Sequence, residues 1–109
     1  MKLSLETRDV GKVTIVRCKG RLVAGVAETL RNEVKLLIPA NRRIVLDLTE
    51  LAQLDSMGLG TIVSLYVTAR AAHCGLELIN LSPRVRELLG ITNLLSVFQM
   101  CGEHRIKLY

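Results

Sequence analysis

The chain has 109 residues and a formal net charge of +5, and half of its residues are apolar while 3% are aromatic. This length suits one domain, and we expect a single domain over residues 1–109. The apolar content excludes disorder of the whole chain. The longest apolar stretch, residues 59–72, is interrupted by polar residues before it reaches the roughly 18 residues of a membrane span.

The basic residues occur singly or in pairs along the chain, which indicates a mildly basic, solvated surface. Such a surface is also compatible with docking to an acidic partner. The scarcity of aromatic side chains argues against a stacking platform for single-stranded nucleic acid. No segment resembles a recognition helix rich in arginine or asparagine, so we expect no direct contact with nucleic acid.

The three cysteines, Cys18, Cys74 and Cys101, form no CxxC pair, and the first residues lack the apolar run of a signal peptide. These features predict reduced thiols in a cytoplasmic protein. A zinc site would have to combine Cys74 and Cys101 with His73 and His104, but that spacing matches no zinc pattern. We therefore expect neither a metal nor a cofactor.

The beginning of the chain alternates between polar and apolar residues, as half-buried strands do. Residues 3–7 and 12–19 carry this pattern, and residues 9–11 lie between them as a turn. The pattern predicts a β-hairpin, with Gly20 ending its second strand.

Two helices and a strand follow. Apolar residues recur with a helical period over residues 26–38, and Pro39 ends that helix. Residues 44–48 form a short, nearly continuous apolar run, which is typical of a strand covered on both faces. The next helix presents an apolar face from Leu59 onward and ends near residues 73–75.

The last elements are a strand at residues 76–81 and a helix that begins at Ser82-Pro83, a hydroxyl cap followed by proline at the first helical position. Gly90 is expected to end this helix, and residues 94–100 suit either a short helix or an edge strand. The whole order predicts an α/β domain with an N-terminal β-hairpin. We expect a mixed sheet of four to five strands with helices packed mainly on one face.

The segment most informative about function is residues 44–60, where the strand containing Asp47 leads to Asp55-Ser56-Met57-Gly58 at a helix start. Asp55 or Ser56 can cap this helix, which leaves first-turn amides pointing outward. A phosphate on Ser56 would add about −1.5 to −2 charges where the helix dipole favours them. By itself, this pattern is also that of an ordinary helix cap.

Three motifs together resemble the STAS domains, and within them the bacterial anti-sigma factor antagonists. They are V-L-D-L at residues 45–48, D-S-x-G-L at residues 55–59 and S-P-x-V-x-x-L-L at residues 82–89. The resemblance extends from Val13 through Phe98. It implies a single STAS domain that acts as a binding switch and not as an enzyme.

The resemblance also implies how the switch operates. In such antagonists the serine after the aspartate of the D-S motif, here Ser56, is phosphorylated by a partner that is both anti-sigma factor and serine kinase. The unphosphorylated form binds this partner and frees a sigma factor, the phosphorylated form is released, and a serine phosphatase resets it. Asp55 would then orient the phosphoacceptor or contact the nucleotide and metal of the kinase, unless it serves only as the cap.

The neighbouring residues take roles by position in the motif. Gly58 keeps the approach to Ser56 open, and Met57 and Leu59 offer apolar contact, although Leu59 also suits the core. The resemblance places a docking loop, residues 21–25, beside the serine, with Arg21, Leu22 and Val23 as its partner-binding residues. Asp47 is expected beneath the same site, or alternatively as an acid that caps the following loop.

Two positions depart from the family pattern. Met57 stands where many antagonists have a second hydroxyl residue, and Val23 stands where many have an acidic one. These departures, with the basic charge, motivate the alternative hypothesis of an accessory STAS subunit for a membrane transporter, such as a lipid-transport ABC complex.

Two further possibilities remain at the sequence level. A hydrolase using Ser56 with His73 or His104 lacks the G-x-S-x-G elbow, so it is disfavoured. A small domain with an exposed sheet edge is also suited to forming a homodimer.

Overall fold

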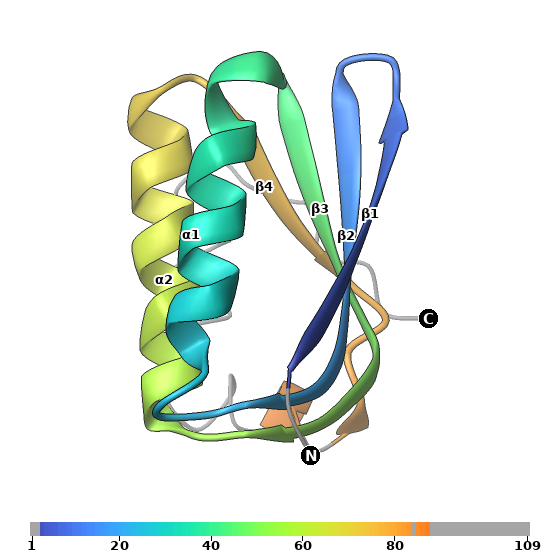
Figure 1. Ribbon diagram of the computed structural model, residues 1–109, viewed down its shortest axis with the longest axis vertical. Coiled ribbons are helices and arrows are strands. Elements are labelled where there is room, and N and C mark those ends of the chain that lie inside the picture. The colour runs from blue at the N-terminus through green and yellow to red at the C-terminus, as the bar shows by residue number, and fades with distance from the viewer. Residues whose placement is uncertain (1–2, 84, 88–109) are drawn as a thin grey trace.

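The computed structural model describes residues 3–83 and 85–87, and within them four strands form one mixed sheet in the order β1-β2-β3-β4. Helices α1 and α2 cover one face of this sheet (Figure 1). The predicted fold class is therefore confirmed. The elements are β1 (Ser4–Val10), β2 (Val13–Leu22), α1 (Ala27–Leu37), the short 3-10 helix η1 (Ile38–Ala40), β3 (Arg43–Leu54), α2 (Ser56–Ala71) and β4 (Gly75–Ile79).

The N-terminal hairpin is confirmed, but its turn lies further along the chain than predicted. β1 and β2 pair antiparallel up to Val10 and Val13, so the turn is the two residues Gly11 and Lys12. Gly11 has a φ of +68°, which suits the first central position of a tight hairpin turn that requires glycine. Asp9, predicted within the turn, belongs to β1.

Both central strands are longer than the sequence pattern predicted, and the prediction that Gly20 ends the second strand is wrong. β2 continues through Gly20, which has a φ of +104°, and β3 extends to Leu54. The parallel register between them shifts twice, near Arg17 and again after Gly20, so β3 contains extra residues. These bulges let the strands stay paired while the side-chain alternation is lost.

The helical predictions agree well with the structure. α1 ends at Leu37, just before Pro39 in η1, and α2 ends before His73, whose φ of +59° forms a left-handed helix end. Ser82 accepts a hydrogen bond from the Val85 amide at 3.2 Å, as a cap does. Residues 88–109, which include the predicted helix end and the last element, lie outside the described residues.

The core lies between the sheet and the two helices. Ile44, Leu46 and Leu48 of β3 are fully buried there with residues of α1 and α2. Cys18 and Cys74 are buried and unpaired, and burial together with the Asp47 charge raises the pKa of Cys18 to about 12. No described helix is long and apolar enough to cross a membrane.

Candidate functional site

Asp55 connects two segments that are far apart in the sequence. One of its carboxylate oxygens, Oδ1, accepts a hydrogen bond from the Gly58 amide at 2.9 Å and so caps α2. The other, Oδ2, accepts from the Ala24 amide in the β2–α1 loop, also at 2.9 Å. Of the two residues that the sequence offered as the cap of this helix, Asp55 is the one that caps it, and it also anchors the neighbouring loop.

These contacts stabilise the charged form of Asp55. Hydrogen bonds from the backbone amides of Ala24 and Gly58 hold the pKa of Asp55 below its ordinary value. The carboxylate therefore stays ionised at neutral pH, at the start of a helix whose dipole favours negative charge.

Gly58 brings α2 against the end of β2. A Cβ atom built on Gly58 would lie 2.0 Å from the carbonyl oxygen of Leu22, so the backbones approach more closely than any side chain allows. Gly58, Leu22 and Leu59 are all buried. These three residues, predicted to bind a partner, therefore pack in the interior beneath the site. Gly58 was expected to keep the approach to Ser56 open, but in the structure it allows close packing of α2 on β2.

The exposed part of the site consists of Ala24, Gly25, Ser56 and Met57, which we call the loop–helix surface. Ser56 is the first residue of α2, and the Met57 side chain beside it is 60% exposed. Methionine is adaptable in shape, so an exposed one offers apolar contact to varied partner surfaces. The surface combines a hydroxyl group, an apolar side chain and a helix N-terminus, and the hydrogen bonds of Asp55 fix its two segments to each other.

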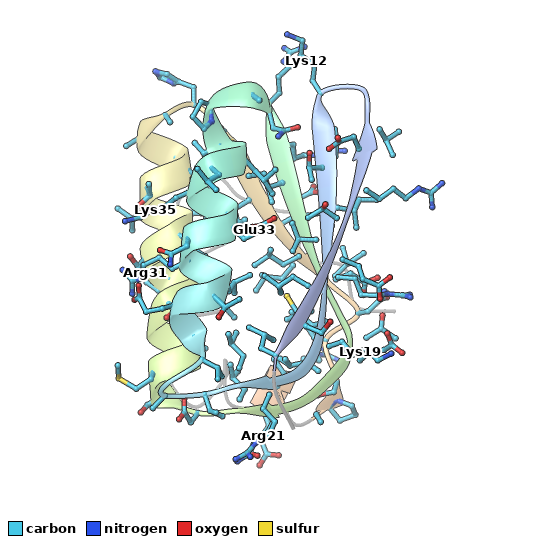
Figure 2. All side chains as sticks on the ribbon, in the orientation of Figure 1. Lys12, Lys19, Arg21, Arg31, Glu33 and Lys35 are labelled. Atoms are coloured by element: carbon cyan, nitrogen blue, oxygen red, sulfur yellow. The ribbon has the colours of Figure 1, made fainter. Side chains whose placement is uncertain are left out.

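The predicted docking loop lies next to this surface. Val23 is half-buried, and its carbonyl oxygen accepts hydrogen bonds from the amides of Val26 and Ala27 at 3.1 and 3.0 Å, which fixes the loop. Arg21 is half-buried and lies at the same end of the molecule as the start of α2 (Figure 2). The structure thus brings the predicted loop and Ser56 together.

Asp47 is not part of this site, and the prediction that it lies beneath Ser56 is wrong. It lies within β3, paired in register with Arg17 of β2 and Ile79 of β4. Its side chain lines a hollow of about 300 Å³ on the sheet face away from the helices, together with Arg17 and Ile79. The strand continues for seven residues beyond Asp47 to Leu54, because the bulges extend it.

The contacts of Asp47 match the alternative interpretation of a local cap. Its Oδ1 accepts hydrogen bonds from the Thr49 amide at 3.0 Å, from the Thr49 hydroxyl and from the Asn80 amide group at 3.0 Å. Arg17 lies 3.5 Å from Oδ2. Burial acts to raise the pKa of Asp47, but these hydrogen bonds and the Arg17 charge outweigh it and lower the pKa.

Sequence reasoning placed the loop of residues 21–25 beside Ser56 but missed two contacts. The Ala24 backbone amide binds Asp55, and the sequence carries no signal for this contact. Asn80 binds Asp47, and its left-handed φ of +58° is a conformation that asparagine tolerates. Within the described residues, which exclude Cys101 and His104, no group of His, Cys, Asp or Glu could hold a metal ion.

Residues 4–107 match the family model of the STAS domain, so the chain belongs to the STAS domain family. It is 32% identical over 103 residues to BtrV of Bordetella bronchiseptica, provisionally named an anti-sigma factor antagonist, covering 94% of this chain and 87% of that protein. It is also 30% identical over 90 residues to a STAS-domain containing protein of Pseudomonas aeruginosa, covering 83% of this chain and 89% of the relative.

Among solved structures, the fold is similar to that of the anti-sigma factor antagonist SpoIIAA. The unphosphorylated form of SpoIIAA aligns with a TM-score of 0.73 at 20% identity, over 91% of this chain and 97% of SpoIIAA. The phosphorylated form, from Bacillus, aligns with a TM-score of 0.72 at 20% identity, over 97% and 92%. At this identity the similarity shows the shared fold.

Proposed function

We propose that this protein is an anti-sigma factor antagonist whose binding is controlled by phosphorylation of Ser56. Unphosphorylated, it binds an anti-sigma factor that is also a serine kinase, in the cytoplasm, and thereby releases a sigma factor. Phosphorylation by that partner ends the binding, and a serine phosphatase restores it. The protein contributes a docking surface and a phosphoacceptor and performs no catalysis of its own.

One observation carries this proposal: an exposed serine at the first position of α2, beside the exposed Met57 and a loop fixed by Asp55. The helix N-terminus tolerates a phosphate within the free protein. A partner packed against Met57 would enclose the same phosphate without a compensating charge, which costs several kcal/mol. The free protein therefore tolerates the phosphate on Ser56, whereas the complex with the partner does not.

The two family departures fit this arrangement. With methionine at position 57, Ser56 is the single hydroxyl of the D-S-x-G motif. With valine at position 23, the loop is held through its backbone carbonyl, and no acidic side chain stands there. We propose that the partner meets a more apolar surface here than in antagonists with polar residues at both positions.

The test is a capture experiment from native lysate with wild type, Ser56→Ala and Ser56→Asp side by side. We expect wild type and Ser56→Ala to retain a protein with a kinase-type ATPase domain, and Ser56→Asp to lose it. Incubation of the captured complexes with ATP should phosphorylate wild type on Ser56 and leave Ser56→Ala unphosphorylated, as mapped by mass spectrometry.

The control for added charge is Ala72→Asp, which places a carboxylate at an exposed position at the opposite end of α2. This variant should bind the partner like wild type. Retention of the kinase by Ser56→Asp would contradict the charge switch. Capture of a permease with its ATPase, unchanged in Ser56→Ala, would instead support a transporter subunit.

A further inference from the structure

β1 leaves one edge of the sheet unpaired within the described part of the chain. It pairs with β2 alone and forms the outer strand of the sheet (Figure 1). All seven of its residues except Leu5 are exposed. An edge of this kind presents free backbone N–H and C=O groups to any strand that approaches.

The direction of these free groups follows from the hairpin register. Val10 and Val13 close a two-residue turn, so that pair exchanges hydrogen bonds across the hairpin. Along an antiparallel ladder, hydrogen-bonded residue pairs alternate with pairs that are not hydrogen-bonded to each other. The N–H and C=O groups of Glu6 and Arg8 therefore point toward β2, and those of Leu5, Thr7 and Asp9 point outward.

The charges along this edge are self-complementary. If β1 of a second copy pairs antiparallel with the two-fold axis at Thr7, Glu6 lies opposite Arg8 of the second copy, and Arg8 lies opposite its Glu6. Both are exposed and share the sheet face that lines the hollow beside Arg17. Neither takes part in any ion pair among the described residues.

Other symmetric registers are worse. An axis at Glu6, Arg8 or Asp9 would place two like charges directly opposite each other, which is destabilising. An axis at Leu5 would shorten the overlap at one end of the strand. The axis at Thr7 aligns all seven residues, and the outward groups of Leu5, Thr7 and Asp9 meet the matching groups of the second copy.

We propose that the protein forms a two-fold dimer through antiparallel pairing of β1 with β1 of a second copy, with the axis at Thr7. The two sheets then join into one continuous sheet, with helices of both copies on the same side. An interface of strand edges is small and weak, so it forms at high protein concentration. It lies on a strand that contributes no residue to the loop–helix surface, and it is therefore independent of the proposed function.

The test is sedimentation equilibrium over a wide concentration series with charge variants. Glu6→Arg should weaken the dimer at least about tenfold, because both cross-strand attractions become repulsions between like charges directly opposite each other. Arg8→Glu should weaken it similarly. The double variant Glu6→Arg with Arg8→Glu should restore wild-type association, since the opposite pairs are re-formed with their signs exchanged.

A second variant tests the backbone register. Thr7→Pro removes an N–H that points away from β2, so an edge strand tolerates it while the dimer loses two central hydrogen bonds. We expect monomers with a nearly unchanged thermal unfolding midpoint. A wild type that stays monomeric throughout, or a dimer that survives Glu6→Arg unchanged, would overturn the proposal. The charge variants decide the matter if Thr7→Pro fails to fold.

Discussion

Two aspartates of this protein are alike in chemistry but serve different regions. Asp55 and Asp47 both accept hydrogen bonds from backbone amides, and both have a lowered pKa. Asp55 connects the β2–α1 loop to α2 next to an exposed serine. Asp47 instead supports a strand bulge on the opposite face of the sheet, with Thr49 and Asn80.

The difference shows that the structural role of an acidic residue in a family motif depends on the groups that surround it. Asp55 lies between two segments that together expose a hydroxyl group and a methionine side chain. Asp47 lies among groups whose hydrogen bonds it satisfies locally, so its loss should affect folding and leave partner recognition to the other region.

The largest expected effect is that of Gly58→Ala, which acts directly beneath the loop–helix surface. The added Cβ would lie 2.0 Å from the Leu22 carbonyl oxygen, so α2 must move away from β2. We expect the free energy of unfolding to fall by about 3 kcal/mol, the upper part of the range for overpacking. Urea denaturation followed by circular dichroism measures it.

Gly60→Ala is the matched control, two residues further along α2. No atom lies within 4 Å of a Cβ built there, and alanine favours a helix over glycine, so this variant should gain about 0.5–1 kcal/mol. Equal decreases in the free energy of unfolding for both variants would show that the close contact at Gly58 does not determine the cost of substitution.

The next largest effect is expected at Asp47. Asp47→Ala leaves the Thr49 amide and the Asn80 side chain without their acceptor, and the cost of such unsatisfied groups is about 1–3 kcal/mol. Denaturant titration should show this loss, while the folded variant binds the proposed partner as tightly as wild type. A loss of binding by the folded variant would show that Asp47 contributes to partner binding after all.

The sequence predicted the local elements well because their signals are local. Polar–apolar alternation revealed the hairpin, a helical period revealed α1, and the Asp-Ser pair marked the start of α2. Even the position of the docking loop beside Ser56 was predicted, although from family resemblance and not from the residues alone.

What the sequence could not predict depends on pairing between distant segments. The extension of β3 past residue 48 needs bulges against β2, and bulges interrupt the alternation by which strands are recognised. That error moved Asp47 toward the end of its strand and so toward Ser56. The packing role of Gly58 depends on Leu22, far away in sequence, and glycine alone does not distinguish close approach from an open surface.

Asp55→Asn is an isosteric change that removes the charge of the cap. Asparagine still caps α2 through its carbonyl oxygen, but that oxygen cannot serve both Gly58 and Ala24 as the carboxylate does. We expect faster hydrogen exchange at the Ala24 amide and weaker partner binding, with a modest loss of stability. Unchanged exchange at Ala24 would show that the loop is held by other contacts.

The same variant has a defined pH dependence. Because the pKa of Asp55 is lowered from 3.8, its stabilising contribution is complete above that value and is lost as the pH falls through the lower pKa of the folded state. Wild type should therefore lose stability below about pH 4 more steeply than Asp55→Asn. Parallel acid-unfolding curves would contradict a stabilising role of the Asp55 charge.

The smallest expected effect concerns the outer ion pair of the Asp47 region. Arg17 lies 3.8 Å from Glu50 as well as 3.5 Å from Asp47, but the Glu50 side chain is 39% exposed whereas that of Asp47 is 11% exposed. Exposed pairs contribute about 0–1 kcal/mol, so Glu50→Gln should lower the free energy of unfolding by less than about 0.5 kcal/mol, and less still in high salt. A loss as large as that of Asp47→Ala would mean that Arg17 is held mainly by Glu50, and that the bulge is stabilised from the solvent side and not by the buried acid.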